Sequence, residues 1–142
     1  MAMIALRDKG YLKHVLSSNI DGLHRKSGFA ADEVTDVHGN TNLEVCCKCN
    51  AGYMRDFKVS KPGKGHKTGR ACDNGTCDGD LKDSVINFGE SLDGEILARG
   101  FEECKKADLS ICMGSSMRVT PSVDMPLETV KNEDGHMVII NL

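Results

Sequence analysis

The sequence predicts an α/β fold in which a doubly wound parallel sheet carries a second, smaller lobe. In the second half of the chain, an amphipathic segment at 94–107 is followed directly by an apolar run of strand length at 109–113. This alternation of helix and strand is typical of parallel sheets that are covered by helices. Between residues 43 and 80 the pattern is interrupted by close cysteine pairs that flank a polar, Gly- and Lys-rich stretch. At 142 residues, the chain has room for one domain with a small insert.

The N-terminal part of the chain is expected to supply one helix and two strands. Apolar positions at helical spacing predict a helix over 1–12. A short buried strand at 14–16 runs into a polar loop at 17–22, and an extended piece at 34–37 leads to His38. Ligands bind at the carboxyl ends of strands in open α/β sheets, so both loops are candidate site segments. Taken alone, the loop at 17–22 also fits an ordinary Asx-rich turn.

His38 is the residue that most strongly indicates chemistry. It is followed by Gly39, which lets a ligand or another backbone approach closely, and it stands shortly before the first cysteine pair. The alternative is a hydrogen-bonded structural histidine, which is the commoner role of a single histidine. The glycine and the polar neighbours favour a role in a site.

Four cysteines predict a structural zinc site of the zinc-ribbon type. They are Cys46, Cys49, Cys72 and Cys77. Two close pairs separated by about twenty residues place each pair on a tight turn, so that four thiolates can surround one metal ion. Cys47 is the alternative in the first pair, but its spacing to Cys49 is poorer. Four unligated thiols are disfavoured because their surroundings are too polar to bury them.

The second half of the chain predicts three strands and one helix. A strand at 81–87 is followed by the amphipathic helix at 94–107, and the apolar run at 109–113 is expected to be a buried central strand. A glycine and two hydroxyl side chains, Gly114–Ser116, come directly after that strand, where they would suit a sugar or a phosphate. A last apolar strand is expected at 137–141.

Composition and charge exclude several classes of protein. The chain is 39% apolar and 27% charged with a net charge of -3, so no attachment to nucleic acid or membrane is expected. Basic residues cluster at 58–70, which we interpret as a solvated loop. No apolar run is long enough to cross a bilayer, and no export signal is visible. The seven cysteines therefore indicate a reducing compartment, with metal or thiol roles rather than disulfides.

Six of these motifs occur in the order found in sirtuins, and the match runs along essentially the whole chain. They are S-N-I-D-G-L-H (18–24), H-G-N (38–40), C-x2-C with C-x4-C, I-N-F-G-E (86–90), G-S-S (114–116) and I-N-L (140–142). The segments H-K-T-G-R-A-C and L-K-D-S-V-I-N-F-G-E most resemble the nuclear branch that includes sirtuins 6 and 7.

The resemblance implies an NAD-dependent protein-lysine deacylase, which transfers the acyl group to ADP-ribose; some relatives are also mono-ADP-ribosyltransferases. Residues 1–42 and 81–142 would form a partial Rossmann-like NAD-binding part, and residues 43–80 the zinc-ribbon lobe. The implied cofactors are NAD and one structural Zn2+. The implied partners are acylated lysines in proteins or peptides, histones among them, with no nucleic-acid or membrane partner. The implied location is the nucleus, with the cytoplasm as the alternative.

The resemblance also assigns roles to single residues. His38 would be the general base that takes a proton from the ribose hydroxyls of NAD, which suits an imidazole because its ordinary pKa lies close to working pH. The implied cofactor-binding residues are Asn19, Asp21, Gly114, Ser115, Ser116 and Asn141. The implied substrate-binding residues are Ile86, Phe88, Gly89 and Glu90, an edge on which a peptide would lie as an added strand.

The chain also departs from the family pattern. Sirtuins begin with a strand and a G-A-G-x-S turn that cradles the pyrophosphate, and Met1 matches a point inside the helix before the first motif, so we expect an N-terminally truncated chain. Ser18 stands where the family has Gln. Losing two or three charge-assisted hydrogen bonds of about 1.5–3 kcal/mol each would weaken NAD binding by orders of magnitude. The alternative function is therefore a non-catalytic zinc-binding interaction module on a degenerate sirtuin remnant. A thiol-redox role for Cys46 and Cys49 is weaker, because metal-bound thiolates are not free nucleophiles.

Overall fold

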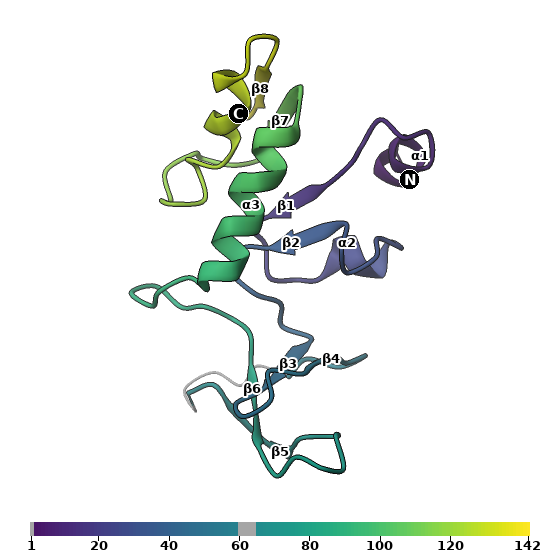
Figure 1. Ribbon diagram of the computed structural model, residues 1–142, viewed down its shortest axis with the longest axis vertical. Coiled ribbons are helices and arrows are strands. Elements are labelled where there is room, and N and C mark those ends of the chain that lie inside the picture. Colours follow the sequence, from purple (N-terminus) through teal and green to yellow (C-terminus); the bar gives the residue numbers. More distant parts are fainter. Residues whose placement is uncertain (1, 60–64) are drawn as a thin grey trace.

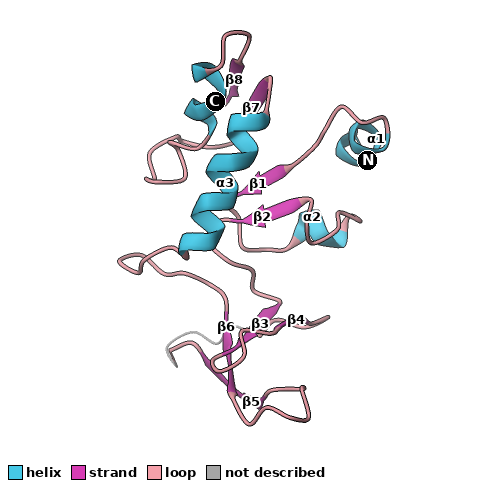
Figure 2. Ribbon diagram, in the orientation of Figure 1, coloured by secondary structure: helices cyan, strands magenta, loops and turns pink. Residues whose placement is uncertain are grey.

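The structure, a computed structural model, describes residues 2–59 and 65–142. Figure 1 shows an antiparallel sheet at one end of the long axis and a parallel strand pair, close to the C-terminus, at the other. A second parallel pair and the longest helix lie between them, as the colours of Figure 2 make clear. Part of the predicted basic loop, residues 60–64, falls outside the described residues.

The N-terminal part of the chain forms two short helices and two parallel strands. These elements are α1 (Ala2–Asp8), β1 (Val15–Ser17), α2 (Leu23–Lys26) and β2 (Val34–Asp36). β1 and β2 pair in parallel with Val15 opposite Val34. Both valines are buried together with Phe29, and Ile4 of α1 packs against them. Because parallel strands end at the same edge, this small core places the loops that follow β1 and β2 side by side.

The first helix is shorter than predicted. The expectation of a helix over 1–12 is wrong beyond Asp8, because Gly10 adopts a φ of 76° and ends the helix. The amide of Gly10 donates to the carbonyl oxygen of Arg7 (2.8 Å), and the amide of Tyr11 donates to that of Leu6 (2.9 Å). This pair of bonds is the Schellman motif, which favours glycine in the left-handed conformation.

A small antiparallel sheet forms the lobe that carries the predicted zinc ligands. Its strands are β3 (Leu43–Cys46), β4 (Gly52–Met54), β5 (Lys67–Ala71) and β6 (Asp80–Asp83), in the spatial order β4-β3-β6-β5. In the central pair Cys46 lies opposite Leu81, and both side chains are completely buried. Glu44, also on β3, is completely buried as well.

The strand predicted at 81–87 is wrong beyond Asp83, and the observed strand belongs to the small sheet. The carboxylate of Asp83 accepts a hydrogen bond from the amide of Val85 (3.0 Å), which closes a turn and ends the strand. Beyond the turn, the amide of Ile86 donates to the carbonyl oxygen of His38 (3.0 Å). This segment is therefore tied to the loop after β2 instead of continuing as a strand.

The C-terminal part of the chain consists of the longest helix, which packs against a 3-10 helix and β2, and of two parallel strands. These elements are α3 (Gly94–Lys106), β7 (Leu109–Met113), η1 (Pro126–Lys131) and β8 (His136–Ile140). Asp93 caps α3 with its side chain, and Cys104 of the helix is buried with Val37 and Met125. Gly100 lies so close to Met125 that a Cβ atom there would be 2.5 Å from the sulfur. None of the described helices is both long and apolar enough to cross a membrane.

Parallel pairing is confirmed for both strand pairs, within a mixed α/β architecture. Among the described residues, however, β1–β2 and β7–β8 are separate two-stranded sheets. The expectation that 109–113 is a buried central strand is wrong, because β7 has β8 as its one strand neighbour there. As a result Leu109, Ile111 and Met113 are each about half exposed.

Candidate functional site

A cleft of about 790 Å³ opens at the carboxyl ends of β1, β2 and β7. It is lined by His38, Leu97 and the segments 18–20, 86–92, 114–116 and 119–123. After each of these three strands, a lining residue follows within two positions of the strand's end. Cavities at this edge of parallel strands are the usual ligand sites of α/β proteins.

His38 lies in the turn directly after β2, half-buried, and lines the cleft. Gly39 has a φ of 81°, and a Cβ atom at this position would lie 1.8 Å from the carbonyl oxygen of Ser84. The expectation that glycine permits a close backbone approach here is confirmed. The carbonyl oxygen of His38 accepts the amide of Ile86, so the main chain around the imidazole is held by neighbouring backbone.

A buried polar cluster frames this turn, and sequence reasoning missed it. Asn40 is completely buried, and its side-chain amide donates to Asp36 (3.2 Å) while its side-chain oxygen accepts the amide of Asn42 (2.9 Å). Arg25 donates to the same oxygen of Asp36 (2.7 Å), and Ser84 exchanges hydrogen bonds with the backbone of Asn40. The polar residues next to His38 in the sequence were the one available signal. They do not reveal that Arg25 of α2 and Ser84, after β6, are their hydrogen-bond partners.

The residues predicted to bind the cofactor fall into two groups. Those that line the cleft are Asn19, Gly114, Ser115 and Ser116. The other two predicted residues, Asp21 and Asn141, do not line the cleft. Asp21 instead accepts the amide of Leu23 (3.0 Å) at the start of α2, and Asn141 is exposed directly after β8.

The residues predicted to contact substrate all line the cleft. They are Ile86, Phe88, Gly89 and Glu90. Phe88 is 98% exposed, so its ring is available to a ligand. The wall formed by 119–123 was not predicted. The available signal was its position shortly after the G-S-S motif, with Pro121 indicating a loop.

The four predicted metal ligands meet at one point of the small lobe. The sulfur atoms of Cys46, Cys49, Cys72 and Cys77 all lie within 4.8 Å of one another. Two of the sulfur pairs are 3.7 Å apart, which is close to the edge of a tetrahedron built from zinc–sulfur bonds of about 2.3 Å. Four cysteine sulfur atoms at this spacing fit one tetrahedral zinc ion. Such an ion would tie β3 to the segment between β5 and β6.

The turn after β3 favours a thiolate at the first of these positions. The backbone amides of Cys49 and Lys48 point at the sulfur of Cys46 and lower its pKa to about 6. Nearby, burial alone would raise the pKa of Glu44, but hydrogen bonds, first that from Arg70 and also that from Arg55, outweigh it and lower this pKa to about 2. The lobe thus holds its buried anionic groups with N–H donors.

Comparison with known sequences identifies relatives along the whole chain. The model of the Sir2 family matches residues 1–121. The NAD-dependent protein deacetylase SRT1 of Arabidopsis thaliana is 39% identical over 142 residues, which are 100% of this chain and 30% of that protein. The NAD-dependent protein deacetylase Sirt6 of Drosophila melanogaster is 36% identical over 152 residues, covering 100% of this chain and 46% of that protein. The chain spans less than half the length of these relatives.

Solved structures agree with the sequence comparison. A Sir2 homologue in complex with NAD superimposes with a TM-score of 0.71 at 31% identity, over 96% of this chain and 49% of that one. Sir2Tm bound to a propionylated peptide gives a TM-score of 0.68 at 29% identity, over 97% of this chain and 55% of that one. Together with the matched family model and the cleft at the strand ends, these likenesses lead to one conclusion: the chain belongs to the Sir2 family.

Proposed function

We propose that the protein carrying this chain is an NAD-dependent protein-lysine deacylase in which His38 is the general base. The observation that carries this proposal is the place of His38 on the wall of the cleft, half-buried and beside the ends of parallel strands. A histidine sealed in a core could not reach a ligand. Relatives named as NAD-dependent protein deacetylases support the same activity.

In this reaction the acyl group of a lysine side chain passes to ADP-ribose, and nicotinamide is released. Bound NAD supplies the electrophilic ribose carbon. The imidazole of His38 would accept a proton from a ribose hydroxyl, which a histidine can do near neutral pH. Gly39 and Ile86 hold the main chain of this turn, so the backbone that carries the ring starts from a fixed position. Such pre-positioning lowers the entropic part of the barrier.

We assign the cofactor side of the cleft to the loops after β1, β7 and β8. Asn19 and Asp21 belong to the first loop, Ser115 and Ser116 to the second, and Asn141 to the third. The second and third loops are adjacent, because the amide of Gly114 donates to the carbonyl oxygen of Ile140 (3.0 Å). Asn141 can therefore act together with the hydroxyls of the G-S-S loop, although it lies outside the lining.

We assign the substrate side to the segment from Ile86 to Glu90. An extended peptide would lie along it and bond mainly through backbone groups, which gives affinity with little demand on sequence. A bound propionylated peptide in the structure of Sir2Tm supports acylated lysine as the substrate class. Histone tails, which are rich in lysine, are our candidate substrates.

Residues 43–80, extended to Asp83 because β6 pairs with β3, serve in this proposal as a zinc-bound scaffold, and residues 1–42 and 84–142 as the cofactor-binding part. The scaffold does no chemistry, since four thiolates leave zinc without an open position. Its task is to hold the exit of β6, from which the substrate segment starts. We further propose a nuclear location, as the likeness to sirtuins 6 and 7 suggests; a fluorescent fusion found in the cytoplasm would contradict it.

The test is release of nicotinamide from NAD in the presence of an acetyl-lysine peptide, using the protein that carries this chain. His38→Ala should lower the rate by about a hundredfold or more, since general-base catalysis contributes on that scale. The matched control is His136→Ala on exposed β8, which should keep the wild-type rate. Turnover that is independent of His38 would overturn the assignment.

A second candidate is a zinc-binding interaction module without catalytic activity. It is favoured by one observation, that the four thiols converge within the small lobe, independently of the cleft. It predicts one zinc ion per chain and no NAD binding by calorimetry. Micromolar affinity for NAD would exclude it.

A further inference from the structure

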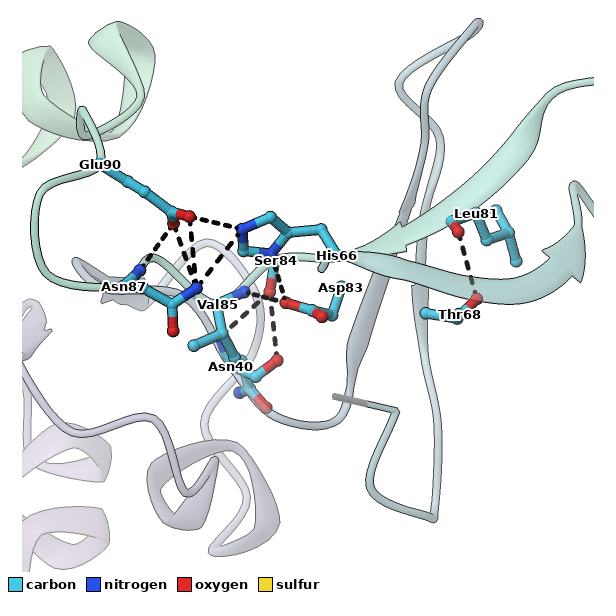
Figure 3. A network of polar contacts seen from close by, with 9 residues as sticks. All are labelled: Asn40, His66, Thr68, Leu81, Asp83, Ser84, Val85, Asn87 and Glu90. Carbon is cyan, nitrogen blue, oxygen red and sulfur yellow. Dashed lines mark hydrogen bonds and ion pairs between the residues drawn. The ribbon is translucent and has the colours of Figure 1, made fainter. Parts of the chain in front are cut away.

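His66, which precedes β5, bridges two carboxylates from different parts of the molecule (Figure 3). Its Nδ1 atom is 3.0 Å from an oxygen of Asp83 at the end of β6. Its Nε2 atom is 2.9 Å from an oxygen of Glu90, which lines the cleft. The imidazole therefore connects the small lobe to the segment assigned above to the substrate.

This geometry favours the charged form of the histidine. Both ring nitrogens face a carboxylate oxygen, and both can donate a hydrogen bond in the imidazolium alone. In neutral imidazole, one nitrogen would turn a lone pair toward an anion. Accordingly, the hydrogen bond with Glu90 and then that with Asp83 raise the pKa of His66, while His66 lowers the pKa of Glu90 to about 2.

Because His66 holds the carboxylate of Glu90, the hydrogen bonds that Glu90 makes with Asn87 hold the turn formed by residues 87–90. Its second oxygen accepts the amide of Asn87 (2.7 Å), and its own amide donates to the carbonyl oxygen of Asn87 (3.1 Å). Between them lie the fully exposed Phe88 and Gly89, whose φ is 89°. Among the described residues the turn has no strand neighbour of its own, so its contacts with His66, the bond from Glu90 and a longer one from the side-chain amide of Asn87 (3.5 Å), anchor it on the small sheet.

We propose that protonated His66 is a positioning residue that fixes the turn Asn87–Glu90 in the shape that receives the acyl-lysine peptide. This inference rests on the proposed deacylase function and adds a proton-dependent determinant of substrate affinity to it. His66 touches neither the cleft nor the reacting atoms, and it acts through Glu90.

The pH dependence follows from the charged groups that face His66. These are Asp83 and Glu90; the neighbouring Lys67 is paired with Asp80 (3.1 Å), and Asn87 is neutral. Because the pKa of His66 is raised above its ordinary 6.5, the tether is complete below about pH 6.5 and is lost as the pH rises through the raised value. Peptide affinity should fall over the same interval.

The test compares His66→Gln and His66→Arg in the zinc-loaded protein that carries this chain. The probe is a fluorescent acetyl-lysine peptide, and its dissociation constant is measured by anisotropy across neutral to alkaline pH. His66→Gln should weaken binding about three- to tenfold near pH 6.5, the range expected when a turn must be ordered on binding. His66→Arg, which stays charged, should restore affinity and remove its pH dependence. His136→Gln on exposed β8 is the matched control and should change neither.

An independent readout separates this inference from the proposed function. The Cε1–H resonance of His66 is titrated by NMR without NAD or peptide, in the wild type and in Glu90→Gln. The pKa of His66 should be raised in the wild type and should fall in Glu90→Gln, while the exposed control Glu133→Gln leaves it unchanged. An ordinary pKa, or equal peptide affinity of His66→Gln at every pH, overturns the tether alone. A wild type that binds no acetyl-lysine peptide overturns the proposed function.

Discussion

The small lobe and the α/β part of the molecule are stabilised by different interactions. In the α/β part, α3 packs apolar and small side chains such as Cys104 against Met125. In the small lobe, the completely buried Glu44 is bound by Arg55 and Arg70, and four thiols converge. Shortening one apolar side chain removes only part of the packing energy. Removing one partner of a buried ion pair or one ligand of a metal site abolishes the interaction as a whole. The two parts should therefore respond to different perturbations.

Removal of the metal should have the largest effect and should be confined to the small lobe. Zinc binding to four thiolates is worth ~10 kcal/mol or more, and most of that energy orders the ligands. Hydrogen exchange after chelation should show β3–β6 unprotected while α3 stays protected. Cys46→Ser should also lose the metal, and Cys47→Ser should keep it. Stoichiometric zinc in Cys46→Ser would contradict the ligand assignment.

Gly39→Ala should destabilise the junction between the two parts by about 4 kcal/mol or more, because a methyl group would collide with main-chain atoms and the φ is positive. Urea denaturation measures the loss. The same substitution at Gly75, around which a Cβ atom has open space, should stay within about 0.5 kcal/mol of the wild type. Equal stability of the two variants would refute the close approach of the backbones.

Glu44→Gln should cost about 3 kcal/mol, because it leaves arginines facing a neutral amide in the interior of the lobe. Glu102→Gln, which breaks an exposed pair with Lys106 on α3, should cost less than about 0.5 kcal/mol. Thermal denaturation of the zinc-loaded proteins compares them. Equal losses would mean that burial makes no difference between the two regions.

The stability difference between the wild type and Glu44→Gln should also depend on pH in a defined way. The pKa of Glu44 is lowered from 4.5 to about 2, so its contribution is complete above pH 4.5 and is lost as the pH falls toward 2. Thiolates also protonate on acidification, so the informative quantity is the difference between the wild type and Glu44→Gln. That difference should shrink over this interval, and a constant difference would show that the carboxylate is not the source.

Asp93→Ala should give the smallest effect, a loss of about 1 kcal/mol from α3. The side chain of Asp93 accepts the amides of Glu95 and Ile96, and alanine leaves both without this partner. Asp93→Ser should recover most of the stability, because serine also caps helices. Calorimetric melting of the two variants decides whether capping is the cause.

The fold was predictable where one local signal dominates. α3 and β7 lie close to their predicted bounds, because helical periodicity and an apolar run need no distant partner to be recognised. The prediction of a strand at 81–87 was wrong because the side chain of Asp83 forms a turn that ends the strand, although apolar residues follow in the sequence. The burial of β7 failed because burial depends on which neighbours a strand receives, and periodicity does not report that.

The candidate site shows the same division. The four predicted metal ligands and His38 follow from spacing and motif, and the structure brings the thiols together and places the histidine on the cleft. Arg25, Asp36 and Asn40 could not be foreseen, since their contacts join α2, β2 and the segment after β6. His66 was hidden for the same reason, as its partners lie 17 and 24 residues further along the chain.

The crossing of Gly39 under the carbonyl group of Ser84 has a consequence for sequence variation. Position 39 accepts nothing larger than a hydrogen atom, because the obstacle is main chain and cannot rotate away. At Ile86 the contact with His38 uses the amide hydrogen, so every amino acid except proline can make it. In a saturation mutagenesis survey, position 39 would therefore tolerate no substitution. Position 86 would exclude only proline on account of this contact.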